Sequence, residues 1–332
     1  MEYRRLGTSG LRVSAVGLGC NPFGNEVDPS GAERIVGRAL DLGVTYFDTA
    51  DSYFEGRSED FLGRALLSRR GEAIIATKFG NPMGTGANDT GTSRQHIVVA
   101  CEDSLRRLRT DYIDVYQVHS PDRAVPLEET MRALDDLVRA GKVRYLGCSN
   151  FHEGEIVEAL WIADKRHLTP FALAQDFYNL LYRDLEKRMA PLCERFGLGM
   201  MAYFPLAGGL LSGTYRRGEA PPPGSRGAGR PSFKTWDSAH NWDVQEKLAA
   251  FARERGWALP QMALAWLLSR KMTFSVIAGA DTPDHIGENV TALDIHFSVD
   301  DLAELDRLTL IDEDRTVAPM LGRPRARVDN SH

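Results

Sequence analysis

The sequence contains few cysteines, and none of them are grouped. Its four cysteines are widely spaced, and no two of them form a C-x-x-C pair: Cys20, Cys101, Cys148 and Cys193. This spacing excludes a Cys-rich zinc module and gives no disulfide framework. Isolated cysteines of this kind are typical of a reducing compartment.

Long apolar segments are also missing. No apolar run reaches the roughly 18 residues that a membrane-spanning helix needs, and the opening MEYRRLGTSGLRVS lacks the apolar core of a signal peptide. The net charge is −6, from 40 Lys and Arg against 46 Asp and Glu. Mild acidity argues against nucleic acid or an anionic membrane as the main partner. We therefore expect a cytoplasmic protein with neither of these partners.

The common motifs for nucleotide phosphates and catalytic zinc are absent. Gly17 and Gly19 are followed by Gly24, which misses the spacing of G-x-G-x-x-G, and no G-x-x-x-x-G-K-[ST] is present. His152-Glu153 lacks the second histidine of H-E-x-x-H. We expect no Rossmann fingerprint, no P-loop and no metal site.

What the sequence does contain is a regular alternation of two patterns. With 43% hydrophobic and 26% charged residues in 332, it is an ordinary globular chain. Continuous short apolar runs are typical of buried parallel strands. Eight such runs occur: Ala15–Leu18, Val44–Phe47, Ala73–Thr77, Ile113–Val118, Val143–Gly147, Phe171–Ala174, Met200–Phe204 and Phe274–Ala278.

Amphipathic segments with helical spacing separate these runs, and several end at a glycine. They are Ser30–Leu42, Ser58–Leu67, Ser93–Leu108, Leu127–Ala140, Glu153–Ala163, Asp184–Phe196 and Pro260–Ser269. The alternation predicts an α/β fold, a single (β/α)8 TIM barrel domain over residues 1–332. A doubly wound open sheet is the alternative. The first twelve residues, around Gly7 and Gly10, suggest a β-hairpin that plugs the bottom of the barrel.

One long segment has neither pattern. Leu206–Asn241 follows the seventh strand, is rich in Gly, Pro and Arg, and has no strong period. It predicts a long mobile loop, either a tolerated surface insertion or a lid or phosphate clamp. The polar tail Arg323–His332 is expected to fray.

Three successive strands are followed by charged or titratable residues. The second ends at Asp48, the third at Lys78 and the fourth at His119, with Tyr53 close behind Asp48. Any one of them is an ordinary polar residue at a strand end. Together they suggest chemistry, because a neighbouring ammonium lowers the pKa of a phenol from about 10. A phenol of this kind can donate a proton to a carbonyl oxygen during reduction, while a cofactor supplies the hydride.

Later strands end in amide and hydroxyl side chains. Ser149 and Asn150 follow the fifth strand and Gln175 the sixth, and such groups hold a carboxamide by hydrogen bonds. Tyr203 lies near the end of the seventh strand, where it can stack on a flat ring. Helix capping and barrel packing are the ordinary alternatives for these side chains.

These residues lie in motifs that resemble the aldo-keto reductase superfamily: FDTADSY, TKFG, VHSPD, GCSN and YFPLAGGLLSGTY. The resemblance extends from YRRLGTSGLRVS to GADTPDHIGEN and is closest to the branch of bacterial reductases and potassium-channel β subunits. It implies an NAD(P)H-dependent aldo/keto reductase that binds its cofactor without a Rossmann domain. Tyr53 would be the general acid, tuned by Lys78 with Asp48, and His119 would position the substrate carbonyl.

The resemblance also implies a cofactor site along the same end of the barrel. Ser149, Asn150 and Gln175 would grip the carboxamide, and Tyr203, with Phe204 beside it, would stack on the ring. The remaining residues would contact the phosphates and the adenosine: Leu206, Gly208, Ser212, Arg226, Gly279, Asp281, His285, Glu288 and Asn289.

Three positions depart from the family pattern. Thr214 stands where many relatives have lysine, Asp281 lies at or next to a position that is often small and hydroxylated, and His285 replaces a common Gln or Arg. A missing lysine and an added carboxylate weaken binding of a 2′-phosphate, whereas a carboxylate accepts hydrogen bonds from a ribose 2′-OH. The family favours NADPH (NADP), and these residues leave NADH open.

The substrate is less specified. Phe23 and Phe54 are candidates for the substrate pocket, and Trp236 and Trp242 either line its mouth or anchor a lid. An apolar mouth favours aromatic or aliphatic aldehydes and ketones, so we expect a small carbonyl or alcohol substrate. A nicotinamide-binding regulatory subunit with slow turnover is the alternative, and a metal-dependent sugar isomerase is disfavoured because Lys78 would repel the ion. A homo-oligomer remains open.

Overall fold

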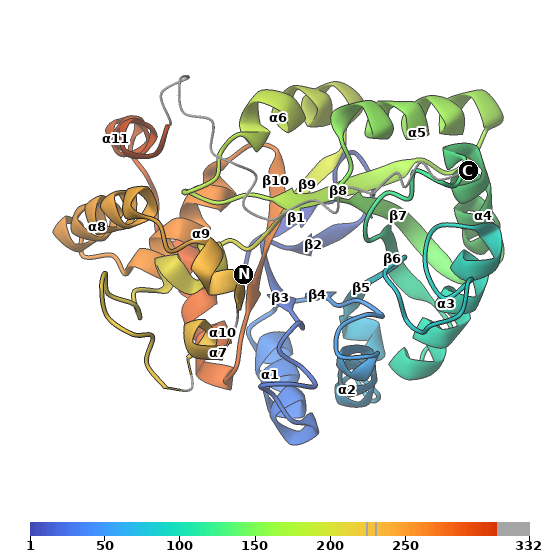
Figure 1. The fold of residues 1–332 in the computed structure, drawn as a ribbon, viewed down its shortest axis with the longest axis horizontal. Coiled ribbons are helices and arrows are strands. Elements are labelled where there is room, and N and C mark those ends of the chain that lie inside the picture. Colours follow the sequence, from blue (N-terminus) through green and yellow to red (C-terminus); the bar gives the residue numbers. More distant parts are fainter. Residues whose placement is uncertain (224, 230, 311–332) are drawn as a thin grey trace, which may run out of the picture.

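Eight parallel strands form a closed ring in the computed structural model of this chain (Figure 1). The structure describes residues 1–223, 225–229 and 231–310. The ring is ordered β10-β3-β4-β5-β6-β7-β8-β9, which confirms the TIM barrel and rules out the open sheet. Its strands are β3 (Val16–Gly19), β4 (Tyr46–Asp48), β5 (Ile74–Phe79), β6 (Ile113–Val118), β7 (Val143–Ser149), β8 (Phe171–Phe177), β9 (Gly199–Tyr203) and β10 (Thr273–Gly279).

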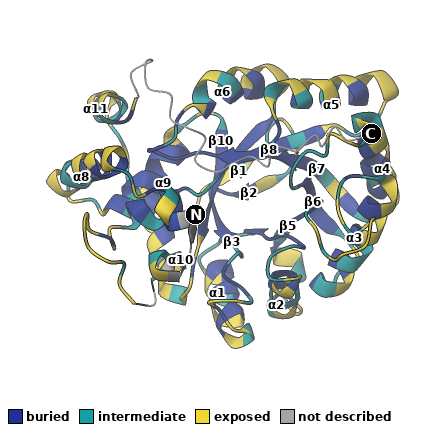
Figure 2. Cartoon of the chain, in the orientation of Figure 1, coloured by how far each residue is buried: buried dark blue, intermediate teal, exposed yellow. Residues whose placement is uncertain are grey.

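Helices surround the ring, and most of them bury one face, as the dark faces in Figure 2 show. The bounds are α1 (Pro29–Asp41), α2 (Arg57–Ala65), α3 (Arg94–Leu108), α4 (Leu127–Arg139), α5 (Glu153–Arg166), α6 (Leu185–Phe196), α7 (Arg226–Gly229), α8 (Ala239–Glu254), α9 (Leu259–Ser269), α10 (Pro283–Val290) and α11 (Val299–Thr309). Local sequence sets their starts: Asp28 accepts the Gly31 N–H at 2.7 Å and Pro29 opens the first turn of α1.

The N-terminal hairpin closes the end of the barrel at which the strands begin, called the lower end here, as expected. Strands β1 (Tyr3–Arg5) and β2 (Arg12–Ser14) pair antiparallel. Leu6 and Val13, both fully buried, join the apolar cluster inside the barrel. Gly7 has φ +55°, and a Cβ there would lie 2.4 Å from the Gly197 carbonyl oxygen. This approach requires glycine, because any side chain would force the hairpin off the barrel.

The segment after β9 is more structured than the sequence predicted. Short 3-10 helices cover Ala207–Ser212 and Pro231–Thr235, α7 lies between them, and α8 begins inside the expected loop. Trp236 is 2% exposed and stacks on Phe177 with ring centroids 5.1 Å apart. Trp242 is also buried, and its indole N–H donates to Asp237 Oδ1 at 2.7 Å. Both tryptophans are therefore packing anchors of this segment.

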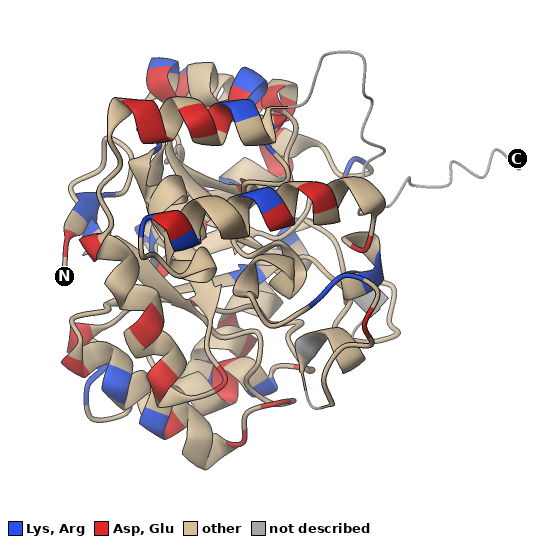
Figure 3. Cartoon of the chain, turned by 90° about the vertical axis from the view of Figure 1, so that its left-hand side faces the viewer, with Lys and Arg blue, Asp and Glu red and all other residues tan. Residues whose placement is uncertain are grey.

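Charges of both signs are spread over the outer helices (Figure 3), often as ion pairs such as Arg132 with Glu128. Within the described ranges, no helix combines the length and the apolarity that crossing a bilayer requires. All four cysteines are buried and free of disulfides. The tail Arg323–His332, expected to fray, lies outside the described residues.

Candidate functional site

Strand alternation places polar side chains at one end of the barrel interior. The apolar cluster inside the barrel contains Tyr46 and Ala76, and the residues two positions later on the same strands are Asp48 and Lys78. Because side chains alternate across a strand, residues two apart face the same way. Val115 is likewise followed by Gln117 and His119. The interior thus changes from apolar to polar toward the carboxyl ends of the strands.

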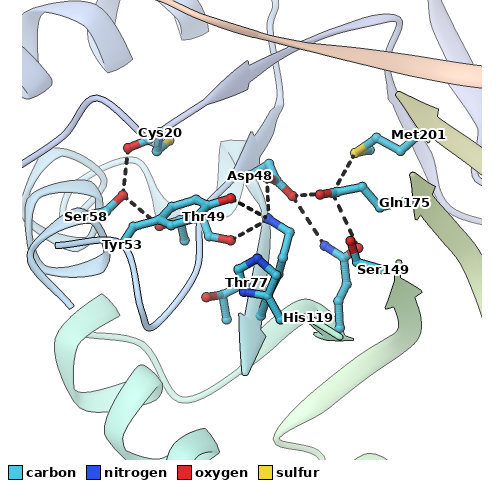
Figure 4. Close-up of polar contacts among 12 residues, drawn as sticks. Cys20, Asp48, Thr49, Tyr53, Ser58, Thr77, His119, Ser149, Gln175 and Met201 are labelled. Atoms are coloured by element: carbon cyan, nitrogen blue, oxygen red, sulfur yellow. Dashed lines mark hydrogen bonds and ion pairs between the residues drawn. The ribbon is translucent and has the colours of Figure 1, made fainter. Parts of the chain in front are cut away.

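The Lys78 ammonium contacts three residues at this polar end, and Figure 4 labels all three of them: Asp48, Thr49 and Tyr53. The Lys78 side chain is fully buried, and its Nζ donates to Asp48 Oδ2 at 2.6 Å and to the Thr49 carbonyl oxygen at 2.9 Å. The same Nζ lies 3.5 Å from the Tyr53 hydroxyl. Three of the four predicted catalytic side chains are therefore in direct contact through one ammonium.

Burial and charge act in opposite directions on this group. Burial alone would lower the pKa of Lys78, but the Asp48 carboxylate and the Tyr53 hydroxyl outweigh it, so the pKa stays above its usual value. Burial raises the pKa of Tyr53, and the Lys78 ammonium only partly offsets this. The sequence-based expectation of a net lowered pKa for Tyr53 is therefore wrong for this structure, because it left out desolvation of the phenolate.

Tyr53 sits on a strained turn between β4 and α2. Phe54 and Glu55 both have positive φ values, of 50° and 58°, and Gly56 follows at 83°. Non-glycine residues in this region cost energy and persist only where surrounding contacts hold them. Here the Asp51 N–H donates to the Lys78 carbonyl oxygen at 3.0 Å. The turn is thus tied by its backbone to the residue that contacts the Tyr53 hydroxyl.

His119 completes the predicted tetrad. Its ring meets the Tyr53 ring edge-on, with centroids 5.9 Å apart. Its Nδ1 lies 3.1 Å from the Asn81 amide nitrogen, a donor, so Nδ1 accepts and the proton of the neutral ring is on Nε2. Burial and the Lys78 charge lower the pKa of His119 to about 3. The ring is therefore a neutral hydrogen-bond donor at neutral pH.

These side chains open onto a cavity of about 320 Å3. Its wall comes from every strand end of the ring except that of β5: Gly19, Asn21, Pro22, Asp48, Tyr53, His119, Ser149, Asn150, Gln175, Tyr203, Phe204, Pro205, Ile277 and Gly279. Phe23 does not contribute, because its ring is fully buried in the hydrophobic core. Phe54 is also absent from the wall, since the turn carries it toward the Arg57 guanidinium instead. Neither side chain lines this cavity, and their roles in substrate binding stay predictions.

One side of the cavity is rich in amide groups. Asn150, with φ 62°, donates from Nδ2 to the His119 carbonyl oxygen at 2.9 Å and accepts the Tyr203 hydroxyl at Oδ1 at 2.7 Å. Gln175 donates to Asp48 Oδ1 at 2.9 Å. With the Ser149 hydroxyl, this wall offers both donors and acceptors, which a carboxamide needs. The donor set fits the nicotinamide predicted for it.

The other predicted cofactor residues are spread beyond this cavity. Phe204 and Gly279 line it, whereas Leu206, Gly208 and Ser212 lie in or next to the Ala207–Ser212 helix. Asp281, His285 and Glu288 are exposed on or next to α10, while Asn289 is buried and donates to the Gly279 carbonyl oxygen at 3.4 Å. The side chain of Arg226 lies outside the described part of the chain. Their roles stay predictions.

Sequence reasoning missed two side chains that contact the tetrad. Gln117 is fully buried and donates to Asp48 Oδ1 at 3.3 Å, and Asn81 contacts the His119 ring. Gln117 was detectable, because it lies two residues before His119 on one strand. Among the described residues, no three His, Cys, Asp or Glu side chains are grouped as metal ligands, so no observation favours the isomerase alternative.

Comparisons with known proteins agree on one family. Residues 15–309 match the model of the aldo/keto reductase family. A probable voltage-gated potassium channel subunit beta of Oryza sativa subsp. japonica is 36% identical over 309 residues, covering 89% of this chain and 92% of the relative. An uncharacterized oxidoreductase, YrpG, of Bacillus subtilis (strain 168) is 37% identical over 306 residues, covering 89% and 92%.

Proposed function

This chain belongs to the aldo/keto reductase family and is an NAD(P)H-dependent oxidoreductase, and we propose that it reduces aldehydes or ketones to alcohols, or runs the reverse oxidation. One observation carries the proposal. The Lys78 ammonium contacts both the Asp48 carboxylate and the Tyr53 hydroxyl at the wall of the cavity. A phenol next to a buried cation is suited to giving up a proton to a reacting oxygen.

Tyr53 carries the proton, and Lys78 would stabilise the phenolate that remains after proton transfer. Since burial raises the pKa of Tyr53, the hydroxyl is protonated at neutral pH and available as a donor. After transfer, the phenolate would lie beside the ammonium at hydrogen-bond distance. Asp48 keeps that ammonium charged and in position through its 2.6 Å ion pair. This arrangement lowers the cost of the charge that develops during reduction.

His119 would orient the substrate. Its Nε2–H is the donor of a neutral ring, and the ring lies edge-on to Tyr53 in the cavity wall. Two donors on one side of the cavity can hold a carbonyl oxygen between them. A neutral imidazole is suited to this task because it donates without adding a second cation beside Lys78.

Ser149, Asn150 and Gln175 would hold the carboxamide of the cofactor, with the Tyr203 ring packed against it. When bound, the reduced nicotinamide supplies the hydride. We propose NADPH as the favoured cofactor, as the family resemblance implies, with NADH as the alternative. Asp281 favours NADH, because an exposed carboxylate just before α10 can accept hydrogen bonds from a ribose 2′-OH and would repel a 2′-phosphate. Titration of each cofactor by quenching of tryptophan fluorescence decides between them.

The test is loss of reduced-cofactor absorbance with a panel of aromatic and aliphatic aldehydes and ketones. We expect turnover on some members and a loss of about 10²–10⁴-fold in kcat for Tyr53→Phe. Tyr3→Phe is the matched control, since this exposed phenol at the opposite end of the barrel only donates to the Gly43 carbonyl oxygen. Full turnover by Tyr53→Phe would refute the proton-donor role.

A nicotinamide-binding regulatory subunit is the second candidate. It is favoured by the name of the Oryza sativa subsp. japonica relative, a probable voltage-gated potassium channel subunit beta. Tight cofactor binding with negligible turnover on the whole panel, together with stoichiometric capture of a partner, would favour it over the enzyme.

A further inference from the structure

A second buried polar cluster lies beneath the turn that carries Tyr53. Asp51 belongs to this turn, and its side chain is fully buried. Neither of its carboxyl oxygens has a hydrogen-bond partner in the described part of the chain. The N–H and hydroxyl of the adjacent Ser52 act on the pKa of Asp51 without reaching hydrogen-bond geometry. A buried carboxylate without hydrogen-bond partners costs free energy, so the burial of Asp51 needs an explanation.

The groups around Asp51 come from four neighbouring elements. From α2, the fully buried Glu59 accepts the Thr77 hydroxyl of β5 at 2.6 Å and the Arg107 Nε of α3 at 2.6 Å. Tyr116 of β6 also interacts with Asp51, and within the described ranges its hydroxyl is likewise buried without a hydrogen-bond partner. One cation therefore faces two acidic side chains.

This imbalance determines the protonation state of Asp51. Burial and the Glu59 carboxylate raise the pKa of Asp51 to about 8, although Arg107 acts in the opposite direction. At neutral pH the carboxyl group is mostly neutral. Loss of its proton would place a second negative charge near Glu59 in a buried environment, where Arg107 is the cation that offsets it within the described part of the chain.

Asp51 is also mechanically linked to the catalytic site. Its backbone N–H donates to the Lys78 carbonyl oxygen at 3.0 Å, and Tyr53 is two residues further on. The turn then runs through Phe54 and Glu55, both with strained positive φ. A strained segment moves readily once one of its restraints is lost. A charge on the buried Asp51 carboxyl would therefore act on the same turn that positions the Tyr53 hydroxyl.

We propose that Asp51 is a positioning residue: its protonated carboxyl group keeps the Tyr53 turn in contact with Lys78, and loss of this proton displaces the turn. This inference rests on the proposed role of Tyr53 as proton donor. It predicts a loss of activity at alkaline pH that is caused by a group outside the catalytic tetrad.

The first test is the pH profile of kcat/KM between pH 6 and 10. We expect the wild-type profile to fall above about pH 8, roughly tenfold per pH unit, as one ionisation requires. Asp51→Asn should move this fall upward by at least about one pH unit, and Glu59→Gln should move it downward, since the charge that raises the pKa of Asp51 is then gone. The exposed Asp111→Asn is the control and should leave the profile unchanged.

A fall that stays near pH 8 in Asp51→Asn would overturn the proposal, as would a wild-type profile with no such fall. A merely structural role would change kcat/KM equally at every pH and leave the midpoint where it was. Should Asp51→Asn fail to fold, the downward shift in Glu59→Gln still decides the matter.

The second test does not depend on turnover. Hydrogen exchange of the amides in residues 49–56, corrected for intrinsic exchange, should lose about fivefold or more in protection between pH 7 and pH 9 in the wild type, and less than about twofold in Asp51→Asn. Unchanged protection in the wild type refutes the positioning role. If no carbonyl substrate is turned over but protection still falls, the proposed function fails while the displacement of the turn stands.

Discussion

The two ends of the barrel are equally buried but are stabilised in different ways. At the lower end, Leu6, Val13 and Phe274 fill the interior with apolar contacts. At the upper end, Asp48 and Lys78 fill it with an ion pair that the amides of Gln117 and Gln175 support. Burial therefore does not distinguish the functional end. The functional end differs because its hydrogen-bond donors and acceptors face a cavity.

Backbone strain follows the same division. Five non-glycine residues with positive φ cluster at the upper end: Phe54, Glu55, Asn150, Phe204 and Ala207. The other two such residues in the described ranges, Arg109 and His167, are C-caps of helices, where this conformation is ordinary. The lower end makes its tightest approach with Gly7 instead. Backbone strain is thus concentrated at the end of the barrel where side chains must be oriented toward the cavity.

The largest expected effect comes from removing the ion pair that stabilises the upper end. Lys78→Met should abolish most turnover and also cost about 3–5 kcal/mol of stability, because Asp48 would remain buried without its partner. Chemical denaturation and the absorbance assay measure the two effects. The double variant Asp48→Asn/Lys78→Met should recover much of the stability and none of the activity. Equal instability in the single and double variants would mean that the ion pair is not the cause.

Leu6→Ala, at the lower end, sharpens the comparison. Removing a fully buried leucine should cost about 2–5 kcal/mol of stability and leave kcat of the folded fraction unchanged. Leu67→Ala is the control, since this leucine is 68% exposed. A large fall in kcat without loss of stability would show that the N-terminal hairpin affects the catalytic site.

Asp51→Asn should stabilise the protein in a pH-dependent way. The folded pKa of Asp51 is about 8, against an ordinary 3.8, so the unfolded chain ionises from about pH 4 while the folded chain keeps its proton. Wild-type stability therefore falls as pH rises between these values. The variant lacks this fall and should gain about 1–3 kcal/mol at pH 8, with no gain at pH 4. Denaturation at several pH values, with Asp111→Asn beside it, measures the difference.

The smallest expected effect is an absence of titration at His119. Its pKa is lowered to about 3, so the ring stays neutral from pH 5 to 9 and gives no acid limb near 6.5. The sign for stability is the reverse of that for Asp51: the unfolded chain takes up the proton first, so this contribution is lost as pH falls below about 6.5. NMR of the imidazole nitrogens checks this, with the urea-unfolded chain as reference. A midpoint near 6.5 in the folded chain would contradict it.

Strand ends were the most predictable part of this molecule. Each of the eight apolar runs became a strand, and the residues directly after them, such as Lys78 and His119, reached one rim because parallel strands all end on the same side. Helices α8, α10 and α11 were missed. Helix α8 begins inside the Gly- and Pro-rich segment, whereas α10 and α11 have helical spacing and N-caps, at Thr282 and Ser298, that were detectable in the sequence.

Electrostatics and orientation were harder to predict. The sequence placed Lys78 beside Tyr53 correctly, but the net pKa of the phenol depends on desolvation, which only coordinates reveal. It also proposed Phe23 and Phe54 for the pocket, because an aromatic near a strand end looks alike whether it faces the cavity or the core. The interactions of Gln117 and Asp51 depend on which side of the strand or turn each side chain takes.

Ring closure has a consequence for synthesis. The first barrel strand, β3, pairs on one side with β10, and the partners Gly19 and Gly279 are about 260 residues apart. At typical translation rates the ribosome needs roughly 10–50 s to make that stretch. During this time β3 presents an unpaired edge, which is a template for aggregation. The nascent chain is therefore most vulnerable just before its last strand emerges, and slowing translation there should increase its dependence on chaperones.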